Sequence, residues 1–152
     1  MTKIQISVQR LKHGNDLPLP QNATEFAAGI DLLAAIYDPL TLKQRERKII
    51  PTGISIAIPI GFEAQVRSRS GLAINDGVTV LNSPGTIDAD YRGEIFVILM
   101  NHSEKEFTIK RGTRIAQLIF KPVISVEWKE TTSLPKTKRG IGGFGSTGSE
   151  LV

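Results

Sequence analysis

Short runs in which apolar and polar residues alternate make up most of the first 128 residues. Residues 4–8 alternate in this way, and the pattern recurs over 54–60 and 62–66. Further short apolar segments lie at 97–100, 107–109, 115–120 and 123–128. Glycine, proline, asparagine or charged turns separate most of these runs. Many short strands with turn signals between them predict an all-β sandwich or barrel.

Two segments depart from strand periodicity. Phe26, Ile30, Leu33 and Tyr37 are spaced as on one face of a helix, so the pattern alone predicts a helix over 26–37. Gly29 inside this stretch weakens that prediction. Residues 70–76 are predicted to form one short helix.

The composition changes at about residue 129. Residues 129–149 are mostly Lys, Thr, Ser, Pro and Gly, and five of the 14 glycines fall within 140–148. Such a stretch contributes little to a core, so we expect a β-rich body over 1–128 and a flexible arm over 129–152.

Charge and composition exclude several classes of protein. The 152 residues include no cysteine, which rules out a disulfide scaffold, a Cys-ligated zinc site and a thiol nucleophile. His13 and His102 are the two histidines, which gives little support to a histidine metal cage or a Ser-His-Asp triad. The net charge of +4 comes from 19 basic and 15 acidic residues. The run 43–48 is predicted to be solvated surface, so a strongly basic nucleic-acid surface is not indicated.

The N-terminal residues lack the apolar core of a signal peptide. The longest apolar run, 95–100, is far shorter than a membrane span. We therefore expect a cytoplasmic protein without membrane association.

The glycine-rich stretch of the arm has the chemistry of a nucleotide lid. It matches a dinucleotide fingerprint by letter, but that motif requires a βαβ unit, which the surrounding pattern does not predict. Unobstructed backbone amides with Arg139, Ser146 and Thr147 can nevertheless bind phosphate oxygens, and Phe144 can stack on a base. A disordered tail is the alternative interpretation.

Three polar segments of the body are also candidate sites. Residues 67–72 combine two arginines with Ser and Gly amides that suit phosphate, although Ser70 as a helix N-cap is the alternative. In the second segment, 82–94, Asp88 can act as a general base and Asn82 can recognise a pyrimidine edge, or the segment is only a polar turn.

Gln117 is the third candidate, as the one polar residue of the apolar run 115–120. A polar side chain inside an apolar strand either finds a partner in a site or alternates toward solvent.

Taken together, these segments resemble the trimeric dUTPase family over nearly the whole chain. Five family motifs occur in order, at 28–32 (AGIDL), 69–73 (RSGLA), 85–93 (GTIDADYRG), 114–118 (RIAQL) and 139–148 (RGIGGFGSTG). The resemblance implies a distorted jelly-roll-like β fold with one short helix, a homotrimer with three active sites between subunits, and an arm that closes over a neighbouring site. In this family the segment 26–37 is strand and loop, contrary to the helical spacing.

The resemblance also implies an activity, the hydrolysis of dUTP to dUMP and pyrophosphate, which keeps uracil out of DNA and supplies dUMP for thymidylate synthesis. Asp88 would orient the attacking water, and Asp31 would hold Mg²⁺ through waters. The implied substrate-binding residues are Arg69, Ser70, Gly71, Asn82, Thr86, Ile87, Asp88, Tyr91, Gln117, Arg139, Phe144, Gly145, Ser146 and Thr147. Phe96 departs from the Lys or Met that many members carry near the substrate.

Among the substrate-binding residues that the resemblance implies, those that would contact phosphates are Arg69, Ser70, Gly71 and Gln117. Those that would bind the γ-phosphate are Arg139, Ser146 and Thr147. Tyr91 would pack beneath the deoxyribose and exclude a 2′-hydroxyl. A dCTP deaminase-related enzyme of the same fold, and a non-catalytic nucleotide-binding or nucleic-acid-binding β module, are the alternatives.

Overall fold

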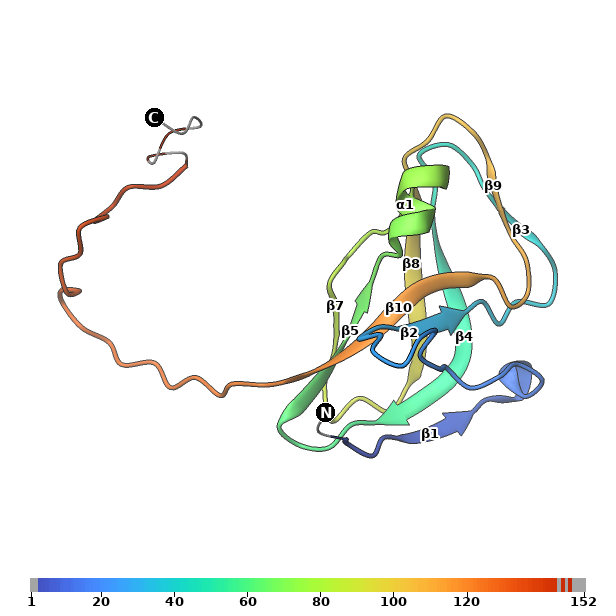
Figure 1. Cartoon of the computed structure of the whole chain (residues 1–152), viewed down its shortest axis with the longest axis horizontal. Helices are drawn as coiled ribbons and strands as arrows, with labels where there is room; N and C mark the ends of the chain where they lie inside the picture. Colours follow the sequence, from blue (N-terminus) through green and yellow to red (C-terminus); the bar gives the residue numbers. More distant parts are fainter. Residues whose placement is uncertain (1–2, 145, 147, 149–152) are drawn as a thin grey trace.

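The computed structural model describes residues 3–144, 146 and 148, and nearly all regular structure in it is β (Figure 1). The elements are β1 Ser7–Arg10, the 3-10 helix η1 Lys12–Gly14, β2 Ile30–Leu33, β3 Leu40–Leu42, β4 Arg47–Ala57, β5 Phe62–Arg67, α1 Ser70–Asp76, β6 Val78–Val80, β7 Gly85–Ile87, β8 Glu94–Asn101, β9 Phe107–Ile109 and β10 Arg114–Pro122. They form sheets ordered β1-β4-β8-β6 and β2-β10-β5-β7, with β3 and β9 as a separate pair.

The core lies between the two four-stranded sheets. Alternation puts Ile95, Val97 and Leu99 of β8 on the buried face, and Ile115, Ala116 and Leu118 of β10 are buried opposite them. All strand pairs are antiparallel, as in a jelly-roll-like fold. The all-β, jelly-roll-like prediction with one short helix is confirmed.

A bulge in β4 interrupts the pairing of this strand with β8. Pro51 pairs with Phe96 but Ser55 pairs with Glu94, so β4 has extra residues between these two points. Gly53 lies in the bulge with φ +69°, a left-handed conformation that suits glycine. Its carbonyl accepts from the Leu11 N–H at 2.8 Å, which fixes the start of η1 against β4.

The helix predicted over 26–37 from spacing alone is wrong. Residues Ile30–Leu33 form β2, which pairs with β10, while Phe26 and Tyr37 are exposed. The apolar residues therefore share no buried helix face, and sheet pairing overrides their spacing. The helix over 70–76 is confirmed, with Arg69 rather than Ser70 as its N-cap residue and Gly77 as its left-handed C-cap.

The segment 123–128 is not a strand, which corrects the prediction for that apolar run. β10 ends at Pro122, and beyond it the chain runs away from the body (Figure 1). Ile124, Val126 and Trp128 are largely exposed. An apolar alternating run becomes a strand only beside a pairing partner, and this run has none in the described part of the chain. The division of the chain at 128/129 stays a prediction.

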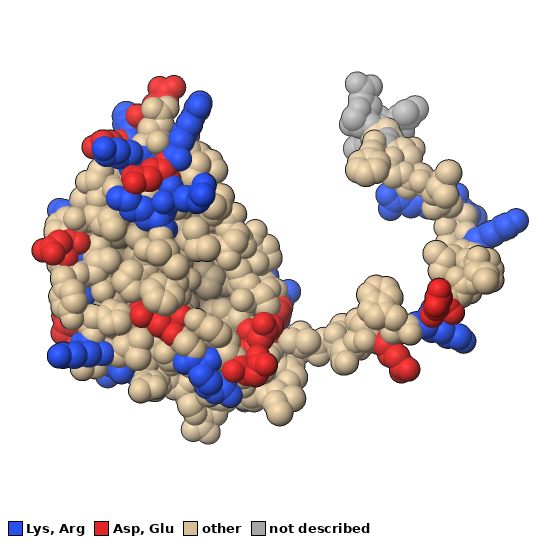
Figure 2. Space-filling model, turned by 180° about the vertical axis from the view of Figure 1, so that it is seen from behind, with Lys and Arg blue, Asp and Glu red and all other residues tan. Residues whose placement is uncertain are grey.

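Charged side chains of both signs are interspersed over the face seen in Figure 2. The basic run 43–48 covers the turn between β3 and β4 and the first two residues of β4, with Lys43, Arg45 and Arg47 exposed. The Lys43 N–H donates to Glu46 Oε2 at 2.8 Å. The prediction of solvated surface for this run is confirmed. Among the described residues, no helix has the length and apolar character needed to cross a membrane.

Candidate active site

The first part of the site is a pocket of about 390 Å³ between β2, β10, the start of α1 and the loop before β2. We name it the arginine pocket. Its lining consists of Ala23, Ala27, Ala28, Gly29, Asp31, Arg69, Ser70, Gly71, Arg114, Gln117 and Ile119. It therefore brings together four predicted phosphate-contacting residues, Arg69, Ser70, Gly71 and Gln117, and the predicted metal-binding residue Asp31.

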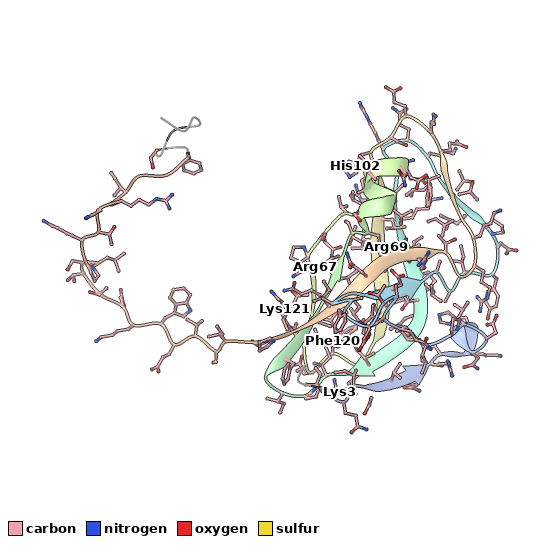
Figure 3. The ribbon with its side chains drawn as sticks, viewed as in Figure 1. Lys3, Arg67, Arg69, His102, Phe120 and Lys121 are labelled. Atoms are coloured by element: carbon pink, nitrogen blue, oxygen red, sulfur yellow. The ribbon has the colours of Figure 1, made fainter. Side chains whose placement is uncertain are left out.

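Two guanidinium groups flank the one carboxylate of this pocket. Arg69 Nε donates to Asp31 Oδ1 at 2.8 Å, and Arg114 Nη1 lies 3.3 Å from Asp31 Oδ2. Arg69 Nη1 also donates to the Arg114 carbonyl at 3.2 Å, and Figure 3 shows Arg69 beside β2 and β10. Two cations beside one anion leave the pocket with a net positive charge and with unused N–H donors, which suits a polyanionic ligand.

Gln117 belongs to the pocket instead of facing open solvent. Its side-chain Nε2 donates to the Ser68 carbonyl at 2.9 Å, and Ser68 Oγ accepts from the Val80 N–H at 2.8 Å. The side chain packs directly over Gly29, where a Cβ would overlap Gln117 Oε1. The strand β10, the β5–α1 connection and the 28–32 motif thus meet at one amide group.

The second part of the site is a pocket of about 320 Å³ beside β7 and β8, which we name the Asp88 pocket. Its lining consists of Ile49, Asn82, Thr86, Ile87, Asp88, Tyr91, Glu94, Ile95, Phe96 and Ile98. The structure therefore brings together Asp88 with the other predicted nucleoside-contacting residues of the body. Asp88 follows the last residue of β7 and is exposed to the pocket.

The loop after Asp88 is fixed by its own hydrogen bonds. Arg92 Nη1 donates to the carbonyls of Ala89 and Tyr91, both at 2.7 Å, and the Tyr91 N–H donates to the Asp88 carbonyl at 3.1 Å. Tyr91 Oη donates to the Glu94 carbonyl at 2.9 Å, and the ring lies over Gly93, where a Cβ would overlap Oη. Tyr91 is held back against its own loop and remains 44% exposed.

One wall of the Asp88 pocket was indicated by the sequence only at Phe96, whose position the family resemblance puts near the substrate. Ile49, Phe96 and Ile98 line it from the outer face of β4 and β8. The signal was present, because a continuous apolar run such as 95–100 puts apolar residues on both faces of its strand. Arg114 and Glu94 are further lining residues without a predicted role. Arg114 stands at the start of the fourth motif, which could have marked it.

The predicted lid residues that the structure describes, Arg139, Phe144 and Ser146, line neither pocket. Arg139 and Phe144 are on the extended arm, where Arg139 Nε donates to the Gly142 carbonyl at 2.8 Å and Phe144 is fully exposed. The Ser146 N–H donates to the Gly143 carbonyl at 3.1 Å. Gly145 and Thr147 lie outside the described residues. Arg67 also does not line the arginine pocket, since its guanidinium binds Gln65 Oε1 of the same strand.

The profile of the dUTPase family matches residues 15–148 of the chain. The chain belongs to the dUTPase family. Deoxyuridine 5′-triphosphate nucleotidohydrolase from Rickettsia felis is 54% identical over 148 residues, which cover 97% of this chain and 99% of that protein. Like its relative, this member of the dUTPase family is an enzyme that hydrolyses dUTP.

Solved structures agree on the fold of this dUTPase-family chain. A Staphylococcus bacteriophage 80alpha dUTPase variant with dUpNHpp has a TM-score of 0.85 at 24% identity, covering 96% of this chain and 99% of that one. A dUTPase variant from phage phi11 of S. aureus, described with a structural Mg(II) ion, has a TM-score of 0.77 at 21% identity, covering 88% and 100%.

Proposed function

We propose that the chain hydrolyses dUTP to dUMP and pyrophosphate by an in-line attack of water on the α-phosphorus, with Asp88 as the general base. One observation carries this assignment. An exposed carboxylate at the end of β7 opens into a pocket with an apolar wall, while a separate pocket of net positive charge suits the phosphates. A carboxylate can orient a water and take its proton as the new P–O bond forms.

The nucleoside is assigned to the Asp88 pocket. Asn82 carries both amide donors and a carbonyl acceptor, so it can complement the polar edge of uracil, together with the backbone of Thr86 and Ile87. A pocket closed around C5 of the base disfavours the methyl group of thymine. Tyr91 lies against its own loop and lines the pocket, which supports a role beneath the sugar, where its ring would exclude a 2′-hydroxyl.

The triphosphate is assigned to the arginine pocket. Arg69, Ser70, Gly71 and Gln117 line it, and their N–H and O–H groups are the donors that phosphate oxygens need. Charge that develops on the leaving pyrophosphate is stabilised by donors already in place, at no further cost of reorganisation.

Magnesium fits this pocket as a substrate-bound ion. Asp31 is the one carboxylate among the lining residues, and the described residues hold no cluster of three or more potential ligands. Mg²⁺ keeps several waters and is commonly held by one or two carboxylates with substrate phosphates, so a single carboxylate is a sufficient donor set. Asp31 would hold the ion through waters, and the ion would supply charge neutralisation on the triphosphate.

We further propose that the active enzyme is a homotrimer with shared sites. The linings of the two pockets have no described residue in common, and the described lid residues lie in neither. The exposed apolar residues Ile124, Val126 and Trp128 give a single chain uncovered surface that association would bury. Together these observations support a site assembled from several copies, with Arg139, Phe144 and Ser146 supplied by an arm that closes on it.

The first test is a substrate panel. The protein with Mg²⁺ is incubated with dUTP, dCTP, dTTP and UTP, and pyrophosphate and ammonia are measured. We expect pyrophosphate from dUTP and little from the others. Ammonia from dCTP would indicate the deaminase-related enzyme, and no turnover would indicate a binding module.

The second test concerns Asp88 itself. Asp88→Asn is expected to keep dUTP binding and to lower kcat by about 10²- to 10⁴-fold, the contribution typical of a general base. Asp90→Asn is the matched control, since Asp90 is an exposed carboxylate of the same loop that does not line the pocket. Full activity in Asp88→Asn would refute the assignment of the base.

A further inference from the structure

Glu94 is a largely buried carboxylate that lines the Asp88 pocket. Its side chain makes hydrogen bonds to residues that do not line this pocket. Its side chain is 11% exposed. Oε1 accepts from the Gly53 N–H at 2.7 Å and lies 2.8 Å from His13 Nε2. The carboxylate therefore joins β8 to both the β4 bulge and the N-terminal η1.

The bulge explains why a carboxylate is placed here. Between Pro51 and Ser55 the ladder with β8 is interrupted, so the Gly53 N–H has no β8 carbonyl opposite it. Glu94 supplies the missing acceptor from its side chain. His13 Nε2 contacts the same oxygen, and the His13 side chain is 27% exposed.

The backbone carbonyl of Glu94 also holds the side chain of Tyr91. The Glu94 carbonyl accepts a hydrogen bond from the Tyr91 hydroxyl at 2.9 Å, and this bond fixes the tilt of the ring of a residue that is 44% exposed. Glu94 is the first residue of β8 and directly follows the loop that ends at Gly93. Strand pairing therefore holds the chain after Glu94 but not the loop before it. The side-chain bonds to Gly53 and His13 supply the anchor that the loop side lacks.

We propose that His13 and Glu94 are positioning residues for sugar selectivity, which hold Tyr91 at the tilt that admits deoxyribose and excludes ribose. This inference rests on the proposed function of Tyr91. His13 is itself held firmly, because its carbonyl accepts from Arg111 Nη2 at 2.7 Å. The brace therefore runs from the N-terminal segment through His13 and Glu94 to the phenol of Tyr91.

The test compares His13→Ala with His102→Ala, the chain's other histidine. His102 Nε2 lies 2.9 Å from Thr79 Oγ1, and neither residue lines the Asp88 pocket, so this variant removes a similar bond elsewhere. Steady-state rates with dUTP and UTP give the ratio of the two kcat/KM values. His13→Ala is expected to lower this ratio by about three- to tenfold, the effect of one hydrogen bond, with KM for dUTP raised and kcat unchanged. His102→Ala is expected to keep the wild-type ratio.

Two further variants separate positioning from general stability. Glu94→Gln keeps an acceptor for Gly53 and is expected to retain most of the selectivity that Glu94→Ala loses. Tyr91→Phe removes the hydroxyl, so adding His13→Ala to it should cost no further selectivity if His13 acts through that hydroxyl. Thermal melting of each variant shows whether it is folded.

The outcomes distinguish this inference from the proposed function. Absence of pyrophosphate from dUTP with the wild-type protein overturns both. A wild-type protein that prefers dUTP, with an unchanged preference in folded His13→Ala, overturns the inference alone. An additive loss in the double variant, or an equal loss of kcat for both nucleotides, also overturns it.

Discussion

At the scale of single residues, the missing Cβ of two glycines lets functional side chains lie flat against the backbone. Gln117 packs over Gly29 in the arginine pocket, and Tyr91 packs over Gly93 beside the Asp88 pocket. Both glycines stand inside the motifs that mark the family. Their role here is close approach, since neither has a positive φ.

Gly29→Ala is expected to displace the Gln117 amide and break its bond to Ser68. KM for dUTP should rise, and the unfolding free energy should fall by about 1–3 kcal/mol, the usual cost of overpacking. Gly71→Ala is the control for stability, because a Cβ there meets no atom within 4 Å and Gly71 lies in α1. Urea unfolding of both variants, with steady-state kinetics of Gly29→Ala, checks the prediction. An equal stability change in the two variants would contradict it.

A second residue-scale prediction concerns acid stability. The hydrogen bond from Arg111 holds the pKa of the Asp16 carboxyl below its ordinary value of 3.8. A carboxyl whose pKa is lower in the folded than in the unfolded protein stabilises the fold at any pH above its unfolded-state pKa. This contribution is lost as the pH falls through the folded-state pKa. The melting temperature is therefore expected to fall below about pH 4, and Asp16→Asn should flatten part of that fall.

The effect should be small, because the Asp16 side chain is 71% exposed. Melting curves of the wild type and Asp16→Asn at neutral and acid pH measure it. A difference between the two proteins that persists unchanged from neutral to acid pH would contradict the assignment.

At the scale of elements, the sequence predicted those segments whose structure depends on near neighbours. The helix over 70–76 was predictable because Gly77 ends it and the alternating 62–66 run precedes it. The helix over 26–37 was wrong because pairing of β2 with β10, about 85 residues away, overrides the local spacing. The run 123–128 shows the converse, since its pattern suits a strand but the described body offers no partner.

In the candidate site, too, some residues could be predicted from local sequence patterns and others could not. Arg69, Asp88 and Gln117, which the motifs single out, all line pockets, because these residues follow or interrupt recognisable strands. Their roles toward a substrate stay predictions. The Glu94–Gly53 contact could not be predicted, since it depends on a register shift between β4 and β8 that leaves no mark in hydrophobic alternation.

The arm gives the element-scale prediction. Deleting residues 139–152 should lower kcat/KM for dUTP by about tenfold or more, as expected when an active-site lid is lost. The melting temperature should be unchanged, because the described residues beyond Pro122 are almost all exposed. Deleting only 149–152 is the control for shortening. Loss of folding or of assembly in the longer deletion would show that the arm is structural instead.

At the scale of the whole molecule, the Asp88 pocket and the arginine pocket are separate within one chain. The Asp88 pocket opens beside β7 and β8, and the arginine pocket lies between β2, β10 and α1. If three copies share their sites, Asp88 of one subunit and Arg69 of another act on the same nucleotide.

Subunit mixing tests this arrangement. Arg69→Ala and Asp88→Asn are each expected to be nearly inactive alone. Unfolding and refolding them together in equal amounts should restore about a quarter of the sites in randomly mixed trimers, because one subunit supplies Asp88 and its neighbour supplies Arg69. Refolding each variant alone is the control. No recovery in the mixture would show that each chain completes its own site.

The extended segment beyond Pro122 also makes the enzyme separable by a single cut. Lys129, Lys136 and Lys138 are exposed and stand between the body and the glycine-rich motif, whose first residue, Arg139, is exposed as well. Exposed, irregular backbone is the preferred substrate of proteases. One cleavage by a trypsin-like protease at any of these residues would remove the lid and leave the β body folded, so that the nicked protein would pass tests of folding while failing tests of turnover.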